Sequence, residues 1–149
     1  MNDKVNEIKI SYREKISTLK SSPIKSSSQA AELIFKNWDK NTIGLHETFK
    51  ILLLNNANKV KGVYPLSSGS ITGTLVDIRI LFAIVLKTLS VGVLLAHNHP
   101  SYKLYPSESD KRLTEKIKQA AQILDVAVLD HIIITPDGGY YSFADNGLL

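Results

Sequence analysis

The chain has 149 residues, of which 44% are hydrophobic and 21% are charged. This length fits a single domain, and the composition is close to that of ordinary globular proteins, which argues against a disordered or fibrous chain. The absence of cysteine excludes disulfides and thiolate metal ligands. The net charge of +4 allows contact with nucleic acid but does not indicate it, because the basic residues are scattered along the chain.

Nothing in the sequence predicts insertion into a membrane. The first ten residues have no apolar stretch of signal-peptide length, and the apolar runs ILFAIVL and VGVLLA are too short to cross a bilayer. We therefore expect a cytoplasmic protein without membrane contact.

The first 25 residues are predicted to form one strand and a linker, ahead of a main domain over residues 26–149. Ile8, Ile10 and Tyr12 alternate with polar residues, as in a half-buried strand. The serine-rich segment LKSSPIKSSSQ reads as a loop whose last serines can cap a helix over residues 28–39. The apolar face of that helix collects Ala31, Ile34, Phe35 and Trp38.

The middle of the chain predicts strands around one buried helix. Residues 47–55 and 59–67 flank a polar break and favour a strand-turn-strand unit, and residues 69–77 give a further extended piece. Residues 78–89 are apolar nearly all round, which favours a fully buried helix. The continuous apolar run over residues 91–98 predicts a central strand.

The last third gives the clearest helix and two more strands. Residues 107–124 carry an apolar stripe at helical spacing. Residues 126–135 and 138–144 read as strands around the turn PDGG. The pattern therefore predicts an α/β (α+β) fold, with one mixed sheet flanked by helices.

The segment LLAHNHPS, residues 94–101, places two histidines beside an asparagine at the end of the central strand. The three letters also name a class of nucleases, but those enzymes spread their residues over a hairpin and a helix, so contiguity argues against that class. His97 and His99 are two apart on a strand and point to the same face, so both rings can reach one ion.

A carboxylate follows at the start of the predicted helix. If Ser107 is the helix cap, Asp110 lies in the first turn, where the helix dipole favours a negative charge. Two histidines and one aspartate satisfy the usual ligand count of a catalytic zinc site, which leaves one position for water. Taken singly, each feature has a plainer explanation, because buried histidines are often structural and Ser-x-x-Asp is a common capping pattern.

The pattern His97-x-His99, seven residues, Ser107, two residues, Asp110 resembles the JAMM motif of the JAB/MPN metalloprotease superfamily. The segments HNHPS, PSESD and LDHIII look like its bacterial RadC branch, and the resemblance covers roughly residues 42–149. It implies the MPN fold, similar to that of cytidine deaminases, and bound Zn²⁺ at His97, His99 and Asp110. The Pro-Cys-x-x-Cys ligands of the deaminases are absent, which disfavours base deamination.

The resemblance also implies two catalytic residues. Glu47, in HETF, stands where the family carries its catalytic acid and base, and Ser107 would stabilise the oxyanion. The implied reaction is hydrolysis of a peptide or isopeptide bond in a peptide or protein substrate. Without the resemblance, Glu47 would read as a solvated glutamate at the start of a strand.

The chain departs from the family between Ser101 and Pro106, where YKLY replaces a segment that usually begins with Gly-Asp-Pro. Tyrosine resists backbone conformations open to glycine, so we expect the loop to take a different path. Its apolar side chains should pack on the domain, narrow the mouth of the site or mediate self-association. Arg79 is expected at the family's basic position in a segment that otherwise lacks the His-Pro-Arg-like sequence.

Three residues outside the motif are aromatic and lie near its predicted strands. His131 is expected to be a hydrogen-bonded core residue or a partner of a metal ligand, not a ligand itself. Tyr140 and Tyr141 are expected to pack on an edge strand.

Two alternatives to the hydrolase stay open. One is a DNA-repair or mobile-element protein that acts on or near nucleic acid, and the other is a metal-bound interaction module without turnover.

Overall fold

The computed structural model describes residues 3–9, 11–15, 17–69 and 75–149. Within these residues the chain forms a five-stranded sheet in the order β2-β1-β3-β4-β5. The strands are β1 (Thr48–Leu54), β2 (Val60–Ser68), β3 (Gly92–Asn98), β4 (Ala127–Ile134) and β5 (Tyr140–Ser142). The helices are α1 (Ser27–Lys36), α2 (Ile78–Lys87) and α3 (Glu108–Ile123), preceded by a 3₁₀ turn at Thr18–Lys20.

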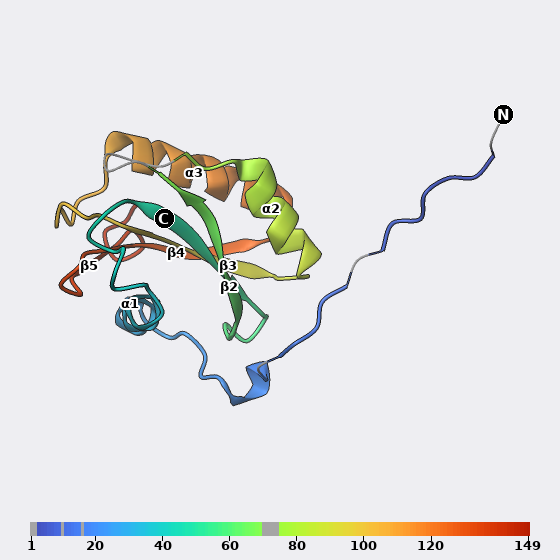
Figure 1. Ribbon diagram of the computed structural model, residues 1–149, viewed down its shortest axis with the longest axis horizontal. Coiled ribbons are helices and arrows are strands. Elements are labelled where there is room, and N and C mark those ends of the chain that lie inside the picture. Colours follow the sequence, from blue (N-terminus) through green and yellow to red (C-terminus); the bar gives the residue numbers. More distant parts are fainter. Residues whose placement is uncertain (1–2, 10, 16, 70–74) are drawn as a thin grey trace.

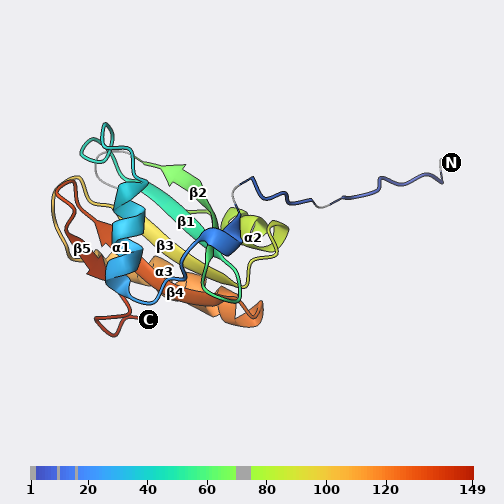
Figure 2. The same cartoon turned by 90° about the horizontal axis from the view of Figure 1, so that it is seen from below.

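The sheet is mixed, as the sequence predicts. β3 runs parallel to β4, and the other neighbouring pairs are antiparallel. Parallel strands need a crossover connection, and α3 provides it between β3 and β4. α1 covers one face of the sheet, and α2 and α3 cover the other, so the domain has three layers (Figures 1 and 2).

Each face of the sheet has its own hydrophobic core, because successive strand residues point to opposite sides. On the α1 side, Leu94 packs with Ile34 and the buried Trp38. On the other side, Leu95 packs with Leu81 of α2 and Ile117 of α3. Leu94 and Leu95 are fully buried, which explains why β3 reads as one continuous apolar run.

The predicted turns and caps are confirmed. β1 and β2 form the expected antiparallel pair, and β4 and β5 pair around the PDGG turn. The side chain of Ser26 accepts a hydrogen bond from the backbone N–H of Gln29 and caps α1. No helix in the described part of the chain is long and apolar enough to cross a membrane.

Two predictions are wrong. The strand expected around Ile8 and Tyr12 is absent from the described residues there, and these side chains are 87% and 43% exposed. Residues 3–9 lie away from the sheet (Figures 1 and 2), and Tyr12 contacts Lys61 of β2 without pairing as a strand. α2 is not buried all round: Leu81 is inaccessible, but Ile80 and Leu86 are about half exposed, because the helix packs on the sheet with one side only. The extended piece expected over residues 69–77 lies mainly outside the described residues.

The letters His-Asn-His divide between the two faces of β3. His97 follows Leu95 onto the α3 side, whereas Asn98 follows Leu94 and Ala96 onto the α1 side. The side-chain oxygen of Asn98 accepts from the backbone N–H of Thr48 at 2.7 Å. Its amide nitrogen donates to the carbonyl oxygens of Ile43 and His46 at 2.7 and 2.9 Å. Asn98 therefore ties the segment that leads into β1 to the end of β3.

We predict that Asn98→Ala lowers the free energy of unfolding by about 3 kcal/mol or more, because it leaves three backbone groups without their partner in a fully buried place. Urea denaturation measures the change. Asn55→Ala is the control, since Asn55 makes similar bonds to Ala57 and Lys59 in the β1–β2 turn, where water can replace them. Equal losses in the two variants would contradict this account.

Candidate metal centre

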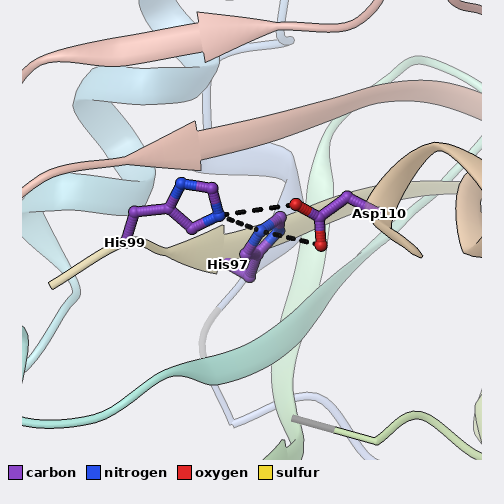
Figure 3. A group of neighbouring side chains, drawn as sticks. All are labelled: His97, His99 and Asp110. Atoms are coloured by element: carbon purple, nitrogen blue, oxygen red, sulfur yellow. Dashed lines mark hydrogen bonds and ion pairs between the residues drawn. The ribbon is translucent and has the colours of Figure 1, made fainter. Parts of the chain in front are cut away.

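Among the described residues, one group of histidine and carboxylate side chains is close enough to hold a metal ion, and it consists of His97, His99 and Asp110. The Nε2 atoms of the two histidines are 2.9 Å apart. The Asp110 carboxylate lies 3.5 Å from each of them, through Oδ1 to His97 and through Oδ2 to His99. Figure 3 shows the three side chains pointing toward one another from the end of β3 and the start of α3.

The crossover from β3 to α3 brings these residues together. The histidines stand at the carboxyl end of β3, which is where ligand sites commonly form in sheets with parallel strands. Asp110 lies in the first turn of α3, where Ser107 is the N-cap. The Asp110 carboxylate accepts from the Ser107 backbone N–H at 2.8 Å, and the Ser107 hydroxyl accepts from the Asp110 N–H at 3.0 Å. This capping box fixes the carboxylate that faces the histidines, so the capping pattern and the ligand site coexist.

The spacing of the ligand atoms fits a small divalent ion. Zinc bonds of 2.0–2.1 Å in a tetrahedron place neighbouring ligand atoms about 3.3 Å apart. The three observed separations are 2.9, 3.5 and 3.5 Å. The site can therefore accept such an ion with small shifts of its side chains.

The position of the proton on His99 also suits a metal ion. His99 Nδ1 lies 2.7 Å from the carbonyl oxygen of Lys103, which can only accept, so Nδ1 carries the proton and Nε2 presents its lone pair to the site. The negative charge of Asp110 and a positive charge on His99 stabilise each other. Burial opposes the charge on Asp110, but in the absence of a metal ion a proton on Nε2 of His97 or His99 outweighs it and holds the pKa of Asp110 well below its usual value, so the carboxylate favours positive charge at the place of the ion. Burial also opposes a positive charge on His99, but Asp110 outweighs it and raises the pKa of His99.

Glu47 lies beside this group. It precedes β1, and Phe49 pairs with His97 across the antiparallel β1–β3 ladder. Glu47 lies two residues before Phe49, just outside the ladder, and close enough to the centre for the charges of His97, His99 and Asp110 to act on it. Burial raises the pKa of Glu47, while the nearby His97 and His99 act to lower it and Asp110 acts to raise it. The same backbone is held on both sides, since the Glu47 carbonyl accepts from Gly69 N–H at 2.8 Å and Asn98 holds Thr48.

Ser107 has hydrogen-bonding capacity left after capping α3. Its hydroxyl oxygen accepts from the Asp110 N–H. Accepting this bond leaves the hydroxyl proton able to donate to another group. Its predicted role at an oxyanion stays a prediction.

The YKLY loop touches the centre through its backbone. Tyr102 has φ of +65°, a left-handed conformation that glycine adopts easily and tyrosine rarely does. Tyrosine therefore does not keep this residue out of the conformation open to glycine, and the different path of the loop stays a prediction. The loop carries the Lys103 carbonyl to His99. Tyr102 and Tyr105 are 58% and 79% exposed, and the Tyr105 ring contacts the edge strand through Tyr141 at a centroid distance of 6.4 Å.

The structure also places the other predicted residues. His131 is fully buried and is not part of the ligand group, as expected; its Nε2 lies 2.7 Å from His97 Nδ1, and burial lowers its pKa well below the usual value. Tyr141 packs against Phe143, as expected for an edge strand. Arg79 pairs with Asp77 at 3.1 Å on the surface, with 93% of its side chain exposed.

Sequence reasoning missed two contributors to the centre. The spacing of the two histidines drew attention to the metal site, whereas the Asn98 side chain between them points to the opposite face of the sheet and holds backbone groups there. The Lys103 carbonyl carries no signal in the sequence, since any residue at that position offers the same backbone group.

Comparison with known proteins gives consistent matches. A family model described as the RadC-like JAB domain matches residues 24–148. A UPF0758 protein of Flavobacterium johnsoniae is 52% identical over 103 residues, covering 69% of this chain and 44% of that protein. UPF0758 proteins of Porphyromonas gingivalis and Aromatoleum aromaticum are 42% and 40% identical, over 69% and 78% of this chain and 45% and 53% of their own lengths. The chain thus spans about half the length of these curated relatives.

We predict that the purified protein binds about one equivalent of zinc per chain and that His97→Ala abolishes this binding, because two remaining ligands hold the ion poorly. Elemental analysis after dialysis gives the stoichiometry. His46→Ala is the control, since His46 lies close to the centre in the fold but outside the ligand group. Full occupancy in the His97 variant would show that the ligands are assigned wrongly.

Proposed function

The chain belongs to the RadC-like JAB domain family, and from this premise we propose that it is a zinc-dependent hydrolase that cleaves a peptide or isopeptide bond. The observation that carries the proposal is the meeting of four groups at the end of β3: two histidine nitrogens, the Asp110 carboxylate and the Glu47 carboxyl. Three of them have the spacing of metal ligands, and the fourth is a half-buried acid beside them.

Zinc is the ion we propose because of the donor set. Two imidazole nitrogens and one carboxylate suit zinc better than magnesium or calcium, which prefer all-oxygen sites. A bound zinc ion would supply a Lewis acid and a water with a pKa near 7. Three protein ligands would leave the fourth position of a tetrahedral zinc ion to that water.

Glu47 is the proposed acid and base. Its electrostatic interactions with His97, His99 and Asp110 support this role, in which the carboxylate would accept a proton from the attacking water. The same carboxyl would then donate that proton to the leaving amine nitrogen. Its raised pKa suits both steps, because a carboxyl that is too acidic returns a proton poorly.

Ser107 is the proposed oxyanion donor. It stands at the N-cap of α3, so its hydroxyl proton and the positive end of the helix both favour a negative oxygen near the centre. The substrate would be a peptide or a protein, and the exposed tyrosines of the YKLY loop would lie at the rim of its binding site.

We predict that Glu47→Gln keeps zinc but lowers amide hydrolysis by at least a hundredfold, because glutamine cannot carry the proton. The measurement is cleavage of a panel of fluorogenic peptides and lysine isopeptides by the zinc-loaded protein, with zinc content determined on the same samples. Glu108→Gln is the control, since Glu108 lies on the exposed side of the same region and pairs with Lys111.

The rate of hydrolysis should also depend on pH. The Glu47 carboxylate must be ionised to accept the proton, so the rate should fall on the acid side as the pH drops through its pKa, which burial raises and nearby positive charge, including a bound zinc ion, lowers. Zinc bound at full occupancy without turnover on any substrate would contradict the hydrolase and leave a metal-bound interaction module. A Glu47→Gln variant with full activity would remove Glu47 from the reaction.

A further inference from the structure

A buried chain of hydrogen bonds runs from His97 into the core. His97 Nδ1 lies 2.7 Å from His131 Nε2, and His131 Nδ1 lies 2.7 Å from the hydroxyl of Thr114. The Thr114 hydroxyl donates to the Asp110 carbonyl oxygen at 2.8 Å. The chain therefore begins at one metal ligand and ends on the backbone of another.

The rings of this chain have no freedom to turn away. His131 is fully buried, stacked on Phe143 at a centroid distance of 4.4 Å and set edge-on to Phe49 at 5.4 Å. His97 also stacks on Phe49, at 5.9 Å, and its ring centroid lies 4.8 Å from that of His131. Thr114 is 1% exposed, so water does not compete for its hydroxyl.

The direction of every bond follows from the carbonyl at its end. The Asp110 carbonyl can only accept, so the single proton of the Thr114 hydroxyl points to it, and the hydroxyl oxygen accepts from His131 Nδ1–H. A neutral imidazole has one donor and one acceptor, so His131 Nε2 must accept from His97 Nδ1–H. His97 Nε2 is thereby left with a lone pair that faces Asp110 and His99.

We propose that His131 and Thr114 are positioning residues, which fix His97 in the Nδ1–H tautomer and so keep its Nε2 atom available for a metal ion. The partner of a metal-binding histidine is usually a carboxylate, a carbonyl or water. Here it is a second imidazole, whose tautomer is set in turn by a hydroxyl on the helix that supplies Asp110. The proposal deepens the metal site above and rests on it only for its consequence in binding.

Loss of the Thr114 hydroxyl should exchange the donor and acceptor roles of His131 and His97 in the hydrogen bond between them. In Thr114→Val, His131 Nδ1–H would have no acceptor in a buried place, which costs free energy. Moving the proton to His131 Nε2 leaves Nδ1 as an unpaired acceptor instead, which buried places tolerate more often than an unpaired N–H, and His97 Nδ1 then becomes the acceptor. His97 would carry its own proton on Nε2, where it blocks the metal.

The test compares Thr114→Val with Thr114→Ser, which keeps the hydroxyl. Long-range ¹H–¹⁵N NMR of the metal-free proteins identifies the protonated nitrogen of each histidine ring. We expect Nδ1–H on His97 in the parent and in Thr114→Ser, and Nε2–H in Thr114→Val. In competition with a chromophoric chelator, Thr114→Val should bind zinc roughly ten- to a hundredfold more weakly than Thr114→Ser.

The two readouts separate this inference from the proposed function. Nδ1–H on His97 in the parent and Nε2–H on His97 in Thr114→Val support the positioning role of His131 and Thr114 even if no zinc binds. In that case only the proposed hydrolase fails. Nε2–H on His97 in the metal-free parent overturns the proposed positioning role. Equal zinc affinity and an unchanged His97 tautomer in Thr114→Val and Thr114→Ser overturn it as well, provided that both variants keep the amide spectrum of the folded parent.

Discussion

The centre depends on an electrostatic constraint: two imidazole nitrogens and a carboxylate converge in a buried place, where like lone pairs repel more strongly than in water. The hydrogen bonds to the Lys103 carbonyl and to His131 hold both Nδ1 atoms as donors, so both Nε2 atoms face each other across 2.9 Å. Only a cation or an added proton relieves such an arrangement. The rest of the local structure preserves it, since the capping box at Ser107 keeps the Asp110 carboxylate in place.

The two faces of the sheet divide the work of building this centre. The α3 face carries the candidate metal ligands, and the α1 face carries Asn98, which anchors the backbone beside Glu47. Because strand residues alternate, one three-residue segment serves both faces. A shift of β3 by one residue would exchange these roles and place the amide in the metal centre. The full burial of the apolar residues that precede the histidines on both faces resists such a shift.

The sequence predicts the parts of the fold that rest on local patterns. The α3 stripe, its serine cap and the apolar run of β3 are strong periodic signals, and the ligand spacing follows from a strand end joined to a helix start. The failures lie where tertiary contacts decide. The alternation around Ile8 needs a sheet edge to pack on, and the exposed side of α2 reflects its single-sided contact with the sheet. The tautomers of the histidines depend on partners 4 and 34 residues away, which no spacing in the sequence reveals.

The central claim is that His97, His99 and Asp110 together bind zinc. Crystals of the zinc-loaded protein, measured on both sides of the zinc absorption edge, test it most directly. The account predicts one anomalous peak per chain, about 2.0–2.2 Å from Nε2 of each histidine and from a carboxylate oxygen of Asp110. A peak at any other group of side chains, or none at this one while zinc is bound, would contradict it.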